Sequence, residues 1–338
     1  MPSMETRKVQ RTGKSTLIVS LPKNWAKTNN VLSGSTLFFS KNQYGDLILS
    51  VERSEPSLSA KLDIGSKSGE PLIRDIIACY VAGYRTVEVF STQMSAAQKR
   101  DLHQIVNKLI GPEILEETIN KVVIQDLLSS EELQPERALK RIKNITKLMI
   151  QDAISALLKS NVDLARDVMQ RDNDVDRLNL LVARQFTEIL RSGSVRQETS
   201  NAVAAFNYMQ AASNLERIAD HASEIADASI HHNCALSVQI EEDLSTLGSS
   251  LSALVEECIF VLLHVDSVKA NRLIDDIVGI RRQMQTMAGS LPRGDPAELQ
   301  LRLIVSGSIE RILDYAMNIN ELTINLSNAN LEEKSPGP

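Results

Sequence analysis

The sequence is poor in aromatic residues and in cysteine. Phe, Trp and Tyr make up 4% of the 338 residues, whereas apolar residues reach 43% and charged residues 24%. This balance is typical of long amphipathic helices with aliphatic cores. Cys79, Cys234 and Cys258 are far apart and form no CxxC pair. Their number and spacing argue against a disulfide framework and a thiolate metal site, and favour reduced core cysteines.

Long apolar runs are also lacking. No stretch approaches the ~20 apolar residues of a membrane span, and no early basic segment leads into an apolar run with a cleavage-like site. We therefore expect a soluble cytoplasmic protein without membrane insertion. No glycine-rich phosphate loop follows a predicted strand, so nucleotide binding has no support. The chain length favours two or three domains.

Charge is distributed unevenly along the chain. Residues 1–53 carry a net charge of +5, so the remaining residues carry −11 of the total of −6. A basic head on an acidic body indicates a polyanion-binding module attached to a part that binds cations or is simply solvated.

Residues 1–55 read as a small β domain. A segment of this size is near the limit below which a domain seldom folds alone, so we expect dimerisation. A short helix is predicted from Pro22 to about Asn29, since proline is tolerated at a first helical position. The strands are predicted at residues 7–10, 17–21, 36–40 and 47–52.

The same segment resembles the AbrB/MazE (SpoVT-AbrB) swapped-hairpin family. The resemblance rests on Arg7-Lys8-Val9, the Gly13 turn, Leu21-Pro22-Lys23 and the run from Leu32 to Leu37. It implies a homodimer with interleaved hairpins that binds double-stranded DNA. The DNA-contacting residues that it implies are Arg7, Lys8, Arg11 and Lys14. Alternatively, these residues only keep an edge hairpin soluble.

Residues 56–128 predict a small β-α-β-α-β connector domain. Gly83 is expected to end its first helix, Ser95 to cap the second, and Gly111-Pro112 to form only a turn or helix break. The domain either spaces the head from the body or senses a ligand between them. Its strands are predicted at 61–64, 86–90 and 121–126, and its helices at 72–82 and 96–110.

The rest of the chain predicts a tandem three-helix-bundle body, so the fold class is mainly α with a small β head. Turn formers separate six helical segments, and short connections favour antiparallel neighbours. The triplets occupy residues 129–230 and 231–330, followed by a disordered tail at 331–338. The helices are predicted at 131–160, 163–192, 197–230, 239–265, 268–291 and 296–326.

A carboxylate motif occurs twice in this body. Glu216 and Asp220 recur 94 residues later as Glu310 and Asp314. Like charges four apart on a helix repel by roughly 0.2 to 0.5 kcal/mol, and a bound cation would offset that repulsion. The alternative is a solvated face in which Arg217 or Arg311 reaches the carboxylates.

The neighbouring helices add further oxygen ligands. Asp172 and Asp176 lie beside the first motif, and Asp275 beside the second, where Asn271 takes the place of Asp172. Such ligands suit iron, manganese, magnesium or calcium, and no organic cofactor is expected. The predicted metal ligands are Asp172, Asp176, Glu216, Asp220, Asp275, Glu310 and Asp314.

The segment Glu216–Ala222 and its repeat make the body similar to PhoU, a family of phosphate-signalling regulators. The second copy has Tyr315 where the family usually has histidine. The resemblance implies two three-helix repeats that bind metal clusters, and a phosphate transporter or signalling protein as partner. Because His221 points off the Glu216/Asp220 face, we expect a core histidine or one that supports the site indirectly.

We therefore expect a phosphate-responsive transcriptional regulator of phosphate uptake and homeostasis with a DNA-binding head. The alternative is an adaptor that controls a transporter or signalling partner without DNA. An enzyme is not expected, because di-metal catalysis in bundles typically uses Glu-x-x-His, and the third residue after each Glu is Ala219 or Leu313.

Overall fold

The computed structural model describes residues 5–41, 47–51, 58–128, 134–191, 199–231, 238–290 and 296–329. The predicted tail at 331–338 lies outside these ranges, as does Cys234. The chain divides into two compact units. One comprises residues 1–56 with 196–198, and the other residues 57–195 with 199–338.

The first unit contains two short antiparallel hairpins and one short helix. The β1–β2 hairpin turns at Gly13, whose φ of +66° favours glycine. Its strands are closer to the turn than predicted. Helix α1 follows Pro22 as predicted. The elements are β1 (Gln10–Thr12), β2 (Thr16–Ile18), α1 (Lys23–Thr28), β3 (Phe38–Lys41) and β4 (Leu47–Ser50).

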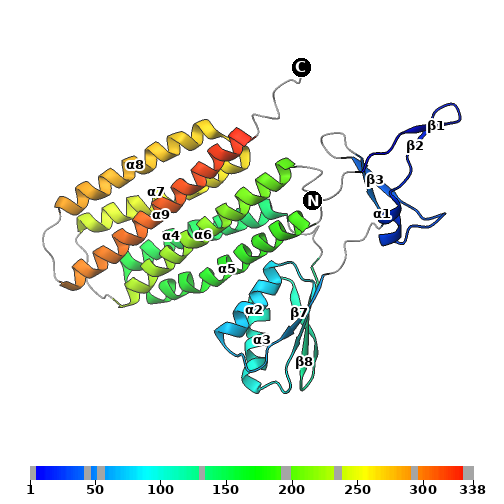
Figure 1. Cartoon of the computed structure of the whole chain (residues 1–338). Helices are drawn as coiled ribbons and strands as arrows, with labels where there is room; N and C mark the ends of the chain where they lie inside the picture. The colour runs from blue at the N-terminus through cyan, green and yellow to red at the C-terminus, as the bar shows by residue number, and fades with distance from the viewer. Residues whose placement is uncertain are drawn as a thin grey trace. The chain divides into compact units, whose positions relative to one another are not determined.

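The second unit begins with a four-stranded sheet and two helices, both on one face of the sheet (Figure 1). The strand order is β5-β6-β8-β7; β5 and β6 are parallel and the other pairs antiparallel. Leu72, Val89 and Leu102 are fully buried between the layers. The elements are β5 (Ser59–Asp63), α2 (Glu70–Val81), β6 (Thr86–Phe90), α3 (Ala96–Lys108), β7 (Pro112–Glu117) and β8 (Lys121–Asp126).

The prediction for this domain was right except for β7. The expectation that Gly111-Pro112 forms only a turn is wrong, because Pro112 is the first residue of β7. A proline is tolerated there because β7 is an edge strand. The predicted helix signals are confirmed: Ser95 forms a capping box with Gln98, and Gly83 follows α2 with a φ of +81°.

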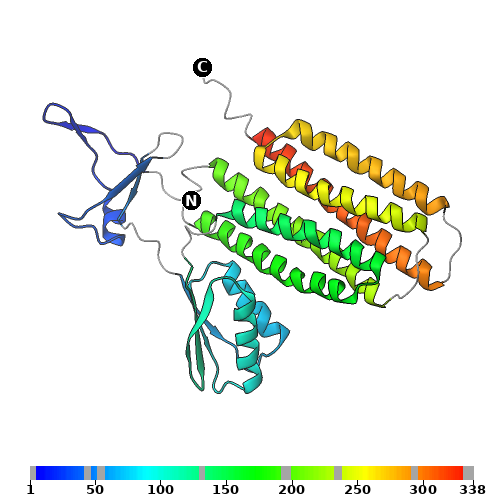
Figure 2. The ribbon, with the colours of Figure 1, turned by 180° about the vertical axis from the view of Figure 1, so that it is seen from behind.

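Six long helices follow and run side by side (Figures 1 and 2). The junctions between the first and second helix of each triplet match. Ser160 and Val265 have positive φ. The side chain of the next residue, Asn161 or Asp266, accepts a hydrogen bond from a backbone N–H of the following helix. The helices are α4 (Pro135–Lys159), α5 (Val162–Arg191), α6 (Thr199–His231), α7 (Val238–His264), α8 (Ser267–Ser290) and α9 (Pro296–Ala329).

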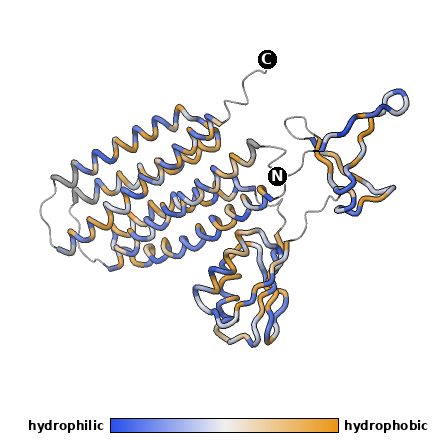
Figure 3. Tube along the Cα trace, in the orientation of Figure 1, coloured by the Kyte–Doolittle hydropathy of each residue, from blue (hydrophilic) through white to orange (hydrophobic). Residues whose placement is uncertain are grey.

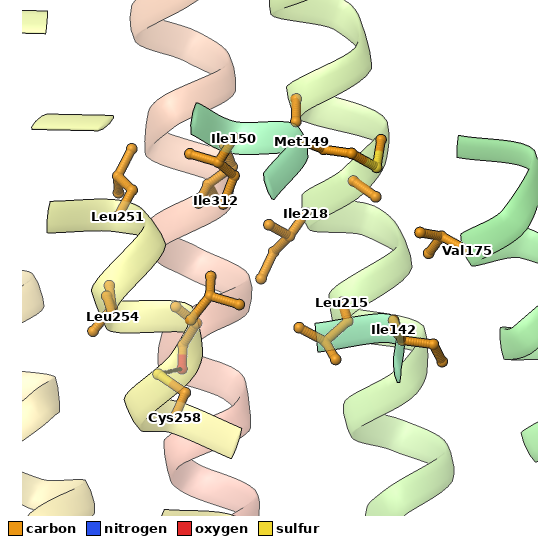
Figure 4. Close-up of a cluster of buried hydrophobic side chains, with 14 of the residues drawn as sticks. Ile142, Met149, Ile150, Val175, Leu215, Ile218, Leu251, Leu254, Cys258 and Ile312 are labelled. Atoms are coloured by element: carbon orange, nitrogen blue, oxygen red, sulfur yellow. Dashed lines mark hydrogen bonds between the residues drawn. The ribbon is translucent and has the colours of Figure 1, made fainter. Parts of the chain in front are cut away.

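The two triplets share one hydrophobic core. Within each triplet all three helices contact one another, and the triplets meet through α6 with α9 and α4 with α7. Apolar residues recur along each helix at helical spacing (Figure 3). Figure 4 shows buried side chains from both triplets, Ile218 and Ile312 among them, in one cluster. Helices α6 and α9, which carry the repeated motif, therefore lie at the junction of the triplets.

One helix departs from the expectation that no segment is apolar enough to span a membrane. Residues Glu242–His264 of α7 meet that criterion by length and composition, with a hydropathy of 1.6. Half of this window is buried, and Leu251, Val255 and Leu262 are completely buried in the shared core. A core helix that is apolar around much of its surface meets the same criterion, so the finding is weak evidence for a span.

Candidate metal centre

The four predicted carboxylates of the first triplet meet where α5 packs on α6. Carboxylate oxygens of Asp176, Glu216 and Asp220 all lie within 4.8 Å of one another. Asp172 and Glu216 are half-buried, whereas Asp176 and Asp220 are exposed. Spacings of four residues place both members of each pair on one face of their helix. The structure thus brings Asp176, Glu216 and Asp220 together, with Asp172 close enough for its charge to raise the pKa of Glu216, and one side of this cluster is open to solvent.

Burial and the charges of neighbouring carboxylates raise pKa values in this cluster. Burial, followed by the negative charges of Asp220 and Asp176, raises the pKa of Asp172 to about 7. The pKa of Glu216 also rises to about 7, through burial and then the charges of Asp220 and Asp176, although Arg217 opposes the shift. Desolvation likewise raises the pKa of Asp176 and of Asp220. The cluster therefore carries negative charge that is incompletely compensated by the protein.

The chemistry of the cluster fits a hard cation. Oδ1 of Asp172 is buried and has no hydrogen-bond partner, which is costly for a carboxylate unless another group coordinates it. All four side chains are carboxylates, the donors that iron(III), manganese, magnesium and calcium accept. Among the residues that the structure describes, no other group of three His, Cys, Asp or Glu side chains comes as close together.

The second triplet is different. Asp275 and Glu310 are exposed, and Asp314 accepts a hydrogen bond from Nη2 of Arg281 at 2.5 Å. Nη1 of Arg311 lies 3.6 Å from the same carboxylate. Guanidinium groups therefore compensate Asp314, and one of them, Arg311, belongs to the motif itself. The structure does not bring Asp275, Glu310 and Asp314 together as it does the first cluster.

Asn271, the residue that breaks the acidic pattern, is used within its own helix. Its side-chain amide donates to the carbonyl of Ser267 at 2.8 Å. It is exposed, as is Asp275 one turn further along α8. The residues of α8 that correspond to Asp172 and Asp176 thus face water.

The two copies of the motif meet through their aromatic positions. His221 stacks on Tyr315 with the ring centroids 5.9 Å apart, and its Nδ1 lies 3.0 Å from a carboxylate oxygen of Glu224. The guanidinium of Arg217 lies 5.7 Å from the Tyr315 centroid. His221 therefore lies between α6 and α9, and it is still close enough for its charge to lower the pKa of Asp220, against the larger effect of burial.

Two basic residues near the cluster were not predicted from the sequence. Lys108, at the end of α3, is close enough for its charge to lower the pKa of Asp176, against the larger effect of burial. Arg177 follows Asp176 on α5, and its Nη2 lies 3.4 Å from the carbonyl of Leu109. Both contacts are made across the packing of the α/β domain on α5, which sequence spacing does not reveal.

The predicted DNA-contacting residues all lie on the exposed first hairpin or the segment before it. Arg7 pairs with Glu5 at 2.7 Å, and Nη2 of Arg11 donates to the carbonyl of Lys14 at 2.5 Å. Arg11 lies on β1, and Lys14 in the turn after it. The four side chains thus present positive charge along one short segment.

The fold and the cluster define a class of proteins: helical bundles built from two repeats, with a carboxylate-lined site on the first. The comparisons specify it further. The PhoU domain family matches residues 139–229, and the family described as "Antidote-toxin recognition MazE, bacterial antitoxin" matches residues 10–57. The chain therefore is a PhoU-like protein with an N-terminal MazE/AbrB-type domain.

Relatives agree with this assignment. The chain is 31% identical over 108 residues to the phosphate-specific transport system accessory protein PhoU homolog 1 of Thermotoga maritima. This match covers 31% of this chain and 44% of that relative. It is 23% identical over 185 residues to the PhoU homolog of Zymomonas mobilis, covering 53% of this chain and 77% of the relative. The match thus spans less than half of the first relative and about three quarters of the second.

One solved structure supports the fold of the body. The phosphate transport system regulatory protein PhoU from Streptococcus pneumoniae superposes with a TM-score of 0.50 at 18% identity, over 58% of this chain and 94% of that one. PhoU from Pseudomonas aeruginosa gives a TM-score of 0.48 at 22% identity, over 58% and 96% of the two chains. The likeness to the first structure supports the helical fold of the body.

Proposed function

We propose that this protein is a cytoplasmic regulator of phosphate uptake and homeostasis that responds to phosphate status. Its relatives are accessory proteins of phosphate-specific transport systems, so a phosphate transporter or a signalling protein is the partner that we propose for the body. A regulatory protein, and not an enzyme, is the class to which these relatives point. The observation that carries the proposal is the carboxylate cluster on the PhoU-like helices α5 and α6.

The cluster would hold a metal cation through Asp172, Asp176, Glu216 and Asp220. A bound cation supplies positive charge that offsets their repulsion and coordinates the unpartnered Oδ1 of Asp172. We include Asp275, Glu310 and Asp314 as a second, weaker site, since the exposed carboxylates of α8 and α9 remain accessible and Asp314 would have to leave Arg281.

The head is proposed to form a homodimer. None of its described residues is buried, although Leu17, Leu32 and Phe39 are large and apolar, with exposed fractions of 67%, 77% and 64%. A domain without a buried residue lacks the hydrophobic contribution that folding requires. A second copy of the head would cover these side chains, which is how the MazE resemblance suggests that it folds.

The dimeric head is proposed to bind double-stranded DNA through Arg7, Lys8, Arg11 and Lys14. Positive charge on an exposed hairpin attracts phosphates, and paired hairpins would double that charge. The alternative is an adaptor whose head only dimerises, while the body controls a transporter by protein contacts.

DNA binding by the full-length dimer, measured over a range of salt concentrations, separates these two functions. We expect a variant lacking residues 1–55 to lose binding, and a variant with Arg7, Lys8, Arg11 and Lys14 replaced by Gln to remain dimeric but to bind much more weakly. Equal duplex binding by all three proteins would leave only the adaptor function.

Metal content tests the body separately. Purified protein, dialysed against Mn²⁺ and analysed for bound metal, should retain it. The double variant Glu216→Gln, Asp220→Asn should retain less, because two anionic ligands become neutral without a change in size. Unchanged metal content in this variant would remove the site from α6.

A further inference from the structure

A cleft lies beside the carboxylate cluster, between the α/β domain and the body. It has a volume of about 200 Å³ and is bounded by α2 and α3 on one side and α5 on the other. Asp176, a member of the cluster, forms part of its wall. A molecule in this cleft would therefore contact both domains and a proposed metal ligand at once.

Two basic side chains in the cleft have hydrogen-bonding capacity to spare. Arg177 has a buried Nε without a hydrogen-bond partner, and its Nη1 lies 3.8 Å from Asp174, which is too long for a strong bond. Lys108 forms no ion pair with any carboxylate in the described part of the chain. Both side chains line the cleft. Together they offer positive charge and hydrogen-bond donors, which an oxyanion accepts.

The acidic residues of the cleft set a condition on that oxyanion. Glu70 and Asp176 also line the cleft and equal Lys108 and Arg177 in charge. The cleft without a metal is thus close to neutral, and the nearby carboxylates would repel an anion. A cation on the cluster neutralises Asp176 and leaves an excess of positive charge. Anion binding in the cleft should therefore require the metal.

The rest of the lining is apolar. Ile73, Ile77, Ile105 and Leu180 form the remaining walls together with polar Gln104 and Asn173. A small group with several oxygens can bind Arg177 and Lys108, and an organic substituent can pack against the apolar residues of the lining. Phosphate and small phosphate esters have this chemistry and fit the volume.

We infer that this cleft binds phosphate, as the free ion or as a small ester, through Lys108 and Arg177 when a cation occupies the neighbouring carboxylate cluster. This inference rests on the proposed function and names the ligand of its sensor body. It also gives the α/β domain a role, because the ligand joins α3 to α5 and links phosphate status to the packing of the two domains.

Equilibrium dialysis with radiolabelled inorganic phosphate tests the inference on the full-length protein. Protein dialysed against Mn²⁺ should retain phosphate, and protein treated with EDTA should not. Lys108→Gln and Arg177→Gln should each weaken retention by about ten- to a hundredfold, as expected for loss of a hydrogen bond to a charged group. Arg166→Gln is the matched control, since Arg166 lies on the same helix outside the cleft, with its side chain 68% exposed.

Bound Mn²⁺ is measured in the same samples, so two kinds of failure can be told apart. Protein that binds Mn²⁺ but no phosphate overturns the cleft inference and leaves the metal centre intact, whereas protein that binds no Mn²⁺ overturns both. Equal phosphate binding by the wild type and both cleft variants also overturns the inference, as does equal binding with and without Mn²⁺. Competition with glycerol 3-phosphate distinguishes the sources: displacement at a lower concentration than unlabelled phosphate identifies an ester.

Discussion

Replacing Asp172 by Asn should stabilise the metal-free protein above neutral pH. The pKa of Asp172 rises from 3.8 to about 7 in the folded state, a shift of about three units that corresponds to roughly 4 kcal/mol at 1.36 kcal/mol per unit. Solvent screens a half-buried group, so we reduce this to ~2 kcal/mol. The side chain of Asn has the same size and no charge, so Asp172→Asn removes the penalty and keeps the packing.

The pH dependence follows from the direction of the shift. Between pH 4 and pH 7 the folded protein keeps a proton on Asp172 that the unfolded chain has lost. The free energy of unfolding of the wild type therefore falls as pH rises through this window and becomes level above it. Glu216, whose pKa is also about 7, adds to the fall. The advantage of Asp172→Asn should be ~2 kcal/mol at pH 8 and close to zero at pH 4.

Urea unfolding followed by far-ultraviolet circular dichroism measures this difference, because most of the helical signal comes from the body. The samples contain EDTA, and a parallel series contains Mn²⁺. Binding to the folded state stabilises by RT ln(1 + [L]/Kd), so Mn²⁺ should stabilise the wild type more than the variant. Asp163→Asn, on the same helix with a side chain 98% exposed, is the control and should change stability by less than ~0.5 kcal/mol.

Two results would refute this reasoning. One is a metal-free Asp172→Asn protein that is less stable than the wild type at pH 8. The other is an equal effect of the substitution at pH 4 and pH 8, because a charge penalty must vanish where the carboxylate is protonated.

Three further predictions concern other parts of the molecule. Arg184→Met should lower the free energy of unfolding by about 3 to 5 kcal/mol, because it leaves Asp126, which lies 2.7 Å from Arg184, buried without a counter-charge. Hydrogen exchange should increase where the α/β domain packs on α5, and unchanged exchange would contradict the prediction. Gly111→Ala should lower the free energy of unfolding by about 1 to 3 kcal/mol, measured by urea unfolding, since the φ of Gly111 is +102° and a Cβ would lie 2.4 Å from Oδ1 of Asp126. Lys8→Gln should make the plot of the logarithm of the DNA association constant against the logarithm of salt concentration less steep, by about one for each phosphate contact that is lost. An unchanged slope would exclude a phosphate contact at Lys8.

Sequence periodicity was sufficient for most of the elements and for the carboxylates that share a helix face in the first triplet. The helical spacing of Asp172 with Asp176 and of Glu216 with Asp220 places each pair on one face, and short connections make α5 and α6 antiparallel neighbours. The edge strand β7 was missed because Pro112 reads as a breaker, and only the position of a strand in its sheet shows that a proline is tolerated.

The contacts between the α/β domain and the helical body could not be predicted from the sequence. Lys108 and Asp176 are 68 residues apart and meet only because the α/β domain packs on α5. Arg281 likewise reaches Asp314 from another helix. Spacing along one helix shows which face a residue occupies, but it does not show which side chain faces it from the next helix. For this reason the two copies of the motif looked more alike in sequence than they are in structure.

The Arg281–Asp314 pair makes the second repeat an internal comparison for the first. Both repeats present an Asp at the same position of the motif, and one of them already has a counter-ion that is part of the chain and cannot diffuse away. In the first repeat, Arg217 and Lys108 lower the pKa values of Glu216 and Asp176, but none of the described residues forms a direct ion pair with Asp220. If the first cluster binds a cation as we propose, the two halves of the duplicated bundle would differ in how one motif carboxylate is compensated: by an arginine of the chain in the second half and by an exchangeable ion in the first.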